Sequence, residues 1–285
     1  MNAVQPRYIA IFIAQLLALV ASSPAFSNAP LTLLDLARSR TASLTELAPE
    51  LAKADLVLVG ESHGNPLHHQ AQLAVIRGLH EAGHPVSVGL EMFQRLEQNV
   101  LDRWIAGSLA EADMVQAFSR NWSIAWEAYR DIFVYCRDNG IPMAGLNVPL
   151  KITRKVAREG FFALTAEEVG LLPPITCSVD PQYEAFLRGF AGSSGHEASF
   201  DRFCQAQLVW DAAMAVHALD FLKTRPDRTM IIMAGSVHAW KPAVPDQVRR
   251  LAPQAAVISI LPETGIKGDR SGIGTSDADF LIPGR

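Results

Sequence analysis

The chain has 285 residues, of which 49% are hydrophobic and 19% charged. This is enough to bury a sizeable core in one domain, or in a domain with an insertion. The formal net charge of −4 at pH 7 excludes the strongly basic balance of a nucleic-acid-binding surface, so no nucleic-acid partner is expected.

Residues 1–27 have the pattern of a secretory signal peptide. Arg7 gives a short positive start, residues 8–21 form an apolar run, and Ala25-Phe26-Ser27 places small residues at the outer positions of a cleavage site. A membrane anchor is the alternative, which the short apolar run disfavours. No cysteine near the cleavage site could carry a lipid, so we expect export to the periplasm with cleavage near Ser27.

Three cysteines are present, namely Cys136, Cys177 and Cys204. In an exported chain, this odd number allows one disulfide and one free thiol, and Cys177 and Cys204 are a candidate pair. Cys136 lies in a helix-like stretch and is expected to be buried. Without a Cys-x-x-Cys spacing, a structural zinc cluster is not expected.

From residue 43 onward, short apolar runs alternate with helical patterns. Strands are predicted at 56–59, 85–90, 141–146, 229–234 and 256–261. Helices are predicted at 43–52, 66–81, 94–105, 113–119, 149–159, 198–223 and 244–251, together with one that follows the aromatic segment 121–129 and ends near 138. This alternation predicts an α/β fold with a mainly parallel central sheet flanked by helices.

Residues 28–265 are expected to form a single α/β domain with a helical insertion at about 160–225. Pro173-Pro174 and the Gly/Ser-rich residues 192–195 interrupt this insertion, so a lid is one interpretation of it. The tail, residues 266–285, is rich in Gly, Ser and Asp and is expected to be flexible.

Polar residues follow four of the predicted strands. Gly60-Glu61-Ser62-His63 and Gly235-Ser236-Val237-His238 are both Gly-x-x-His segments, and Glu91 and Asn147 follow two other strands. Parallel strands place their carboxyl ends at one edge of a sheet, where ligands bind. We therefore predict that these side chains converge on one pocket.

The residue types in this pocket suit two chemistries. Glu61, His63, Glu91 and His238 could act as general acids and bases, or could bind a divalent metal ion. His68 and His69 open the following helix, where each is as well suited to a capping or surface role as to facing the pocket. His217, on the long helix, is typical of a hydrogen-bonded core histidine.

The order of the motifs resembles the ChaN-type haem-binding uptake family. Its pattern matches Gly60 to His63, Glu91 to Phe93, Asn147 to Pro149, Gln207 to Ala215 (Gln-x-x-Trp-Asp-x-x-Met-Ala) and Gly235 to His238. The resemblance covers about residues 56–261. That family belongs to a superfamily with Tiki-type metal-dependent proteases and erythromycin-esterase-like hydrolases.

The resemblance implies an α/β core with helical insertions that binds haem at an exported surface. It also implies iron ligation by a tyrosine, a homodimer with haems stacked between subunits, and an outer-membrane haem receptor as a partner. Tyr129 is the tyrosine that best fits the family pattern, with a core-packing role as its alternative. Trp126, His63 and His238 complete the expected cofactor-binding set.

We therefore carry three hypotheses. The first is an exported haem-binding protein for haem or iron uptake. The second is a metal-dependent or Glu/His-driven hydrolase or protease that uses Glu61, His63, Glu91 and His238. The third is a scaffold that keeps the fold without the chemistry. No Gly-x-Ser-x-Gly, P-loop, His-Glu-x-x-His or dinucleotide-binding motif is present, which disfavours serine hydrolases and nucleotide enzymes.

Overall fold

The computed structural model describes residues 31–191, 197–264 and 272–284. The predicted signal peptide, residues 1–27, lies outside the described residues, as does part of the predicted tail. In the described part of the chain, no helix is long and apolar enough to span a membrane.

One eight-stranded sheet runs through the described residues, in the order β2-β1-β8-β7-β3-β6-β4-β5. The strands are β1 Thr32–Asp35, β2 Arg40–Ser43, β3 Leu56–Glu61, β4 Val86–Gln94, β5 Met143–Asn147, β6 Thr229–Gly235, β7 Val257–Pro262 and β8 Phe280–Ile282. Neighbours from β8 to β5 are parallel, and β1 pairs antiparallel with β2 and with β8. The predicted α/β class with a mainly parallel sheet is confirmed.

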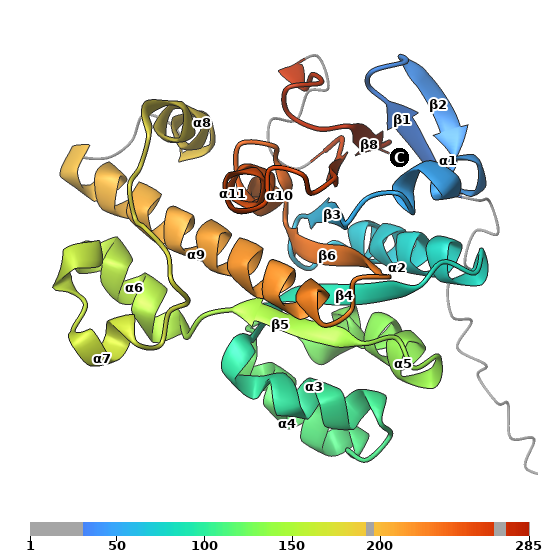
Figure 1. Cartoon of the computed structure of the whole chain (residues 1–285), viewed down its shortest axis with the longest axis horizontal. Coiled ribbons are helices and arrows are strands. Elements are labelled where there is room, and N and C mark those ends of the chain that lie inside the picture. Colours follow the sequence, from blue (N-terminus) through green and yellow to red (C-terminus); the bar gives the residue numbers. More distant parts are fainter. Residues whose placement is uncertain (1–30, 192–196, 265–271, 285) are drawn as a thin grey trace, which may run out of the picture.

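Helices cover both faces of this sheet (Figure 1). They are α1 Leu44–Leu51, α2 Pro66–Glu81, α3 Gln98–Ile105, α4 Glu111–Asn121, α5 Arg130–Asp138, α6 Leu150–Glu159, α7 Ala166–Val169, α8 Pro181–Ala191, α9 Glu197–Lys223, α10 Ser236–Ala239 and α11 Val244–Leu251. Short 3-10 helices lie at Arg95–Glu97, Trp126–Ala128 and Phe161–Ala163.

The side chains of β3 show how the two layers form. Alternate residues of a strand point to opposite faces, so Val57 and Val59 pack with helices α1 to α5, whereas Leu56 and Leu58 pack with α9, α10 and α11. All four side chains are fully buried. Burial on both faces explains why the strand reads as an unbroken apolar run.

The structure corrects the sequence-based expectations at both ends of the chain. The segment before β3, expected to hold one helix, also contains the hairpin of β1 and β2. The expectation of a flexible tail over 266–285 fails at residues 280–282, which form β8 between β1 and β7. Cys136, Cys177 and Cys204 are all free, so the candidate disulfide is not formed, while Cys136 is buried as expected.

Candidate functional site

The carboxyl ends of the parallel strands bring the predicted polar residues to one edge of the sheet. Glu61, at the end of β3, is in register with Gly235 at the end of β6. Glu91 on β4 and Asn147 at the end of β5 lie at the same edge. The predicted convergence is confirmed for His63, Glu91, Asn147 and His238, which line one cavity, whereas Glu61 lies behind His63 and does not line it.

Glu61 is a buried carboxylate with three polar neighbours. His63 Nδ1 lies 2.6 Å from Glu61 Oε1, and the Tyr129 hydroxyl donates to the same oxygen at 2.5 Å. His69 Nε2 lies 3.3 Å from Oε2, an ion-pair distance without hydrogen-bond geometry. Burial alone would raise the pKa of Glu61, but the contacts with His63, His69 and Tyr129 outweigh it and lower that pKa to about 2.

The turn after β3 separates the roles of His68 and His69. The backbone N–H of Ser62 donates to His68 Nδ1 at 2.8 Å, so His68 holds the turn that leads into α2. Asn65 caps α2 through a bond from Leu67 N, and Pro66 occupies the first turn, where no N–H is needed. His69 is the next residue of the helix, and its ring, not that of His68, lies beside the Glu61 carboxylate.

A second carboxylate–histidine pair comes from α9 and α10. His238 Nδ1 lies 2.6 Å from Asp211 Oδ1, and the Tyr183 hydroxyl of α8 donates to Asp211 Oδ2. Burial lowers the pKa of His238, but the charges of Glu91 and Asp211 and the bond to Asp211 outweigh it and raise that pKa to about 9. The site thus holds two similar arrangements, Tyr129–Glu61–His63 and Tyr183–Asp211–His238.

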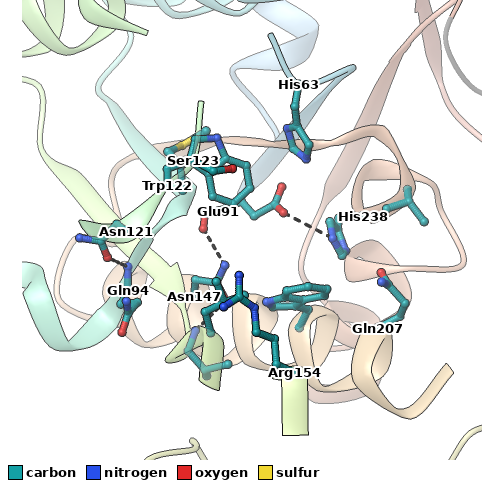
Figure 2. A pocket seen from close by; sticks show the side chains of 15 residues that line it. His63, Glu91, Gln94, Asn121, Trp122, Ser123, Asn147, Arg154, Gln207 and His238 are labelled. Carbon is teal, nitrogen blue, oxygen red and sulfur yellow. Dashed lines mark hydrogen bonds and ion pairs between the residues drawn. The ribbon is translucent and has the colours of Figure 1, made fainter. Parts of the chain in front are cut away.

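Glu91 lies between the two histidines. Its Oε2 accepts a 2.6 Å bond from the Gly235 backbone N–H, and its Oε1 lies 3.5 Å from His238 Nε2. Asn147 Nδ2 donates to the backbone carbonyl of Glu91 at 2.8 Å and fixes the end of β4 against β5. Figure 2 shows His63, Glu91 and His238 pointing toward one another.

These groups open onto a cavity of about 370 Å³, within the size range of ligand pockets. An indole stands edge-on to each histidine, with Trp122 at 4.9 Å from His63 and Trp210 at 5.9 Å from His238 between ring centroids. The cavity is lined by His63, Glu91, Met92, Gln94, Asn121, Trp122, Ser123, Asn147, Val148, Leu150, Arg154, Gln207, Trp210, Val237 and His238.

Several buried polar atoms around this cavity have no hydrogen-bond partner in the described structure. They are Trp122 Nε1, Trp210 Nε1 and Gln207 Oε1 at the cavity, and Glu61 Oε2 with both ring nitrogens of His69 behind it. Buried polar groups are normally hydrogen-bonded, and leaving one unpaired is costly. These atoms are themselves buried, so each leaves a hydrogen bond unmade within the walls of the site.

Tyr129 and Trp126, the two aromatic residues predicted to contact a cofactor, do not line the cavity. Tyr129 is fully buried, and burial together with Glu61 raises its pKa far above the ordinary value. Trp126 is 4% exposed and packs against Phe118 and Phe133 in the core. His217 is a core histidine as expected, with Nδ1 at 2.7 Å from the Leu146 carbonyl oxygen.

Helices contribute further side chains that were not predicted as site residues, although Gln207, Trp210 and Asp211 belong to a motif that was matched to the family pattern. Asp211, Gln207 and Trp210 belong to the Gln-x-x-Trp-Asp segment of α9, and Tyr183 comes from α8. Their spacing of three and four residues places Gln207, Trp210 and Asp211 on one helix face, which was a usable signal. In the described part of the chain, no group of three or more His, Cys, Asp or Glu side chains is arranged to hold a metal ion.

Comparisons with known proteins agree with this geometry. A model of the family described as "Haem-binding uptake, Tiki superfamily, ChaN" matches residues 47–248, which include strands β3, β4, β5 and β6 and every described residue that lines the cavity. Among solved structures, a ChaN protein of Campylobacter jejuni with cofacial haem binding is similar, with a TM-score of 0.70 and 18% identity over 89% of this chain and 96% of that chain. At that identity the likeness shows the fold.

Two further proteins are similar over part of their length. A mutant of the erythromycin esterase EreC in its open conformation has a TM-score of 0.49 and 17% identity, over 82% of this chain and 76% of that chain. RETICULATA-RELATED 5, a chloroplastic protein of Arabidopsis thaliana, is 27% identical over 152 residues, or 51% of this chain. The matched region spans only 20% of that relative's length.

Proposed function

The chain belongs to the haem-binding uptake (ChaN) family of the Tiki superfamily, and on this basis we propose that it binds haem in the cavity beside His63, Glu91 and His238. The observation that carries the proposal is the family match over residues 47–248, which encloses the cavity. The apolar side chains of Met92, Val148 and Leu150, together with the polar side chains of His63 and Arg154, fit an amphiphilic ligand. When haem is bound, its iron is the atom that a protein side chain would ligate.

His63 is the side chain that we propose as the iron ligand. Of the two histidines lining the cavity, the side chain of His63 is 36% exposed and that of His238 only 4%. A carboxylate on Nδ1 orients an imidazole so that Nε2 is the ligating atom, and Glu61 occupies that position. Tyr129 would first have to leave both its buried site and Glu61.

Titration of the purified apo-protein with haemin tests this function. We expect a saturable Soret band that His63→Ala changes strongly and Tyr129→Phe changes little. His84→Ala is the matched control, because His84 precedes β4 at the opposite edge of the sheet. A Soret band that is lost in Tyr129→Phe and kept in His63→Ala would return the ligand to the tyrosine, and no saturable binding would reject haem.

Export, homodimer formation and a role in haem or iron uptake with an outer-membrane receptor are also part of the proposal. The signal-like pattern of residues 1–27 supports export without a lipid. Mass spectrometry of the periplasmic form should give a mature protein that begins near Asn28. An intact N-terminus or an attached lipid would contradict it.

A second candidate is a hydrolase, and the paired histidines favour it. Each histidine is oriented by a buried carboxylate, and Glu91 lies between them, an arrangement suited to general acid–base catalysis. Metal analysis of protein purified without chelator decides whether a metal-dependent form is real. Stoichiometric zinc, manganese or iron that is lost in His238→Ala, with no haemin binding by the wild type, would favour the hydrolase.

A further inference from the structure

Among the described residues that line the cavity, Arg154 is the only arginine or lysine. It lies on α6, and Figure 2 shows its guanidinium extending beside Asn147 toward the space below Glu91. Among the described residues it makes no hydrogen bond, ion pair or ring contact. Its neighbours on the same helix do, since Lys155 pairs with Glu168 at 2.6 Å and Arg158 with Glu159 at 3.5 Å.

Three other polar atoms of residues that line the cavity lack a hydrogen-bond partner among the described residues. The indole N–H groups of Trp122 and Trp210 are donors without acceptors, and Gln207 Oε1 is an acceptor without a donor in a residue that is 9% exposed. These three atoms are buried, whereas the exposed Arg154 side chain is free to meet a ligand. A guanidinium meets a carboxylate through two parallel hydrogen bonds, which makes it the side chain best suited to a planar anion.

Glu91 does not supply that anion. Both of its oxygens are already engaged, one by the Gly235 N–H and the other by His238. The other carboxylates of the site, Glu61 and Asp211, are buried behind their histidines and do not line the cavity. The counter-ion of Arg154 must therefore come from outside the described chain or from solvent.

We propose that Arg154 anchors a carboxylate of the ligand, with the ligand's planar body between Trp122 and Trp210. The inference rests on the proposed function, in which that carboxylate is a propionate of haem. The ligand is therefore a porphyrin that carries free carboxylates, and Arg154 is the residue that selects for them.

Haemin and haemin dimethyl ester, whose propionates are esterified, form the test pair. Arg154→Gln should weaken haemin about 10- to 100-fold, because a charge-assisted bidentate contact is lost, and should leave the ester unaffected. Arg158→Gln is the control, since Arg158 lies one turn further along α6, is 71% exposed and does not line the cavity. It should change neither affinity.

The outcomes separate the inference from the proposed function. Haemin that binds Arg154→Gln as tightly as wild type, or an ester that binds wild type as tightly as haemin does, overturns the role of Arg154 alone. Metal-free protoporphyrin IX, followed by quenching of tryptophan fluorescence, tests the carboxylate contact without iron. If it binds in an Arg154-dependent manner while haemin gives no Soret shift, iron ligation fails and the anchor stands, and if neither porphyrin binds, both proposals fall.

Discussion

Glu61 has an ordinary pKa near 4.5 in an unfolded chain and one of about 2 in the fold, because His63, His69 and Tyr129 outweigh its burial. A carboxylate with a lowered folded pKa contributes stability above the unfolded pKa, and this stability is lost as the pH falls toward the folded value. We therefore predict that acid destabilises wild type more steeply than Glu61→Gln between pH 4.5 and 2. The difference in slope should reach about 1.4 kcal/mol per pH unit.

Urea unfolding at several pH values in this range measures the slope. Glu167→Gln is the control, because Glu167 is exposed on α7 and distant in sequence from the site. Equal slopes for wild type and Glu61→Gln would mean that Glu61 is not held as a carboxylate by these partners.

His238 gives a second prediction with the opposite sign. Its pKa of about 9 lies above the ordinary 6.5, despite burial, because Glu91 and Asp211 favour the charged ring. The resulting stability is present below pH 6.5 and is lost as the pH rises through 9. Asp211→Asn keeps the size of the side chain and removes one of the charges, so the pKa of His238 should fall by one unit or more.

Imidazole NMR across pH 5 to 10 follows this titration directly. Asp220→Asn serves as the comparison, because Asp220 is 46% exposed on the same helix and pairs only with Lys223 among the described residues. A His238 that still titrates near 9 in Asp211→Asn would assign the shift to Glu91 alone.

At the scale of single elements, the turn from β6 into α10 depends on a missing side chain. Gly235 has φ −52° and ψ 142°, which any residue can adopt, so its backbone does not require glycine. Glycine is required here because of the limited space, since a Cβ at this position would lie 2.9 Å from His63 Nε2 and 3.0 Å from His63 Cε1. Gly235→Ala should therefore displace the half-exposed His63 ring and weaken haemin binding at least several-fold, with little loss of stability.

The double variant Gly235→Ala/His63→Ala isolates this clash. In the His63→Ala background, the added methyl group meets no imidazole, so Gly235→Ala should have no further effect on haemin titration or on thermal unfolding. A penalty of equal size in both backgrounds would place the strain elsewhere in the turn.

The strands and the helices of the site differ in how well the sequence predicts them. Glu61, Glu91, Asn147 and His238 were predictable because each follows an apolar run, and the geometry of parallel strands brings their ends together. Asp211 was recognisable only as part of a helical motif, and Tyr183 was not predictable, because a helix contributes a site residue only through its packing angle and register against distant elements. The turn at Trp126–Ala128 shows the same limit, because an aromatic-rich segment fits a core and a ligand site equally well.

At the scale of the whole molecule, the parallel half of the sheet was predictable and the far edge was not. Strands β1, β2 and β8 have four, four and three residues, too few for a period of two to stand out. The pairing of β1 with β8 is also long-range, since Leu34 of β1 is in register with Leu281 of β8. The two ends of the described chain therefore extend the sheet at one side, through a pairing that no local sequence pattern predicts.

Leu281 tests whether this closure stabilises the domain. Its side chain is fully buried in the core that includes Leu56 and Leu261, and its strand lies between β1 and β7. Leu281→Ala should destabilise the protein by about 2–5 kcal/mol, because it leaves a cavity in a packed core. For a chain of this size, that corresponds to a Tm lower by roughly 5–15 °C.

Calorimetry of the apo-protein measures this effect, and Leu251→Ala is the matched control. Leu251 ends α11 with 52% of its surface exposed, so its truncation should cost less than about 1 kcal/mol. If the tail were flexible, the two substitutions would lower the stability by similarly small amounts.

Because β8 joins the hairpin of β1 and β2 to the parallel strands, a large loss of stability in Leu281→Ala should also increase hydrogen exchange in β1. Unchanged exchange there would show that the hairpin is held without β8.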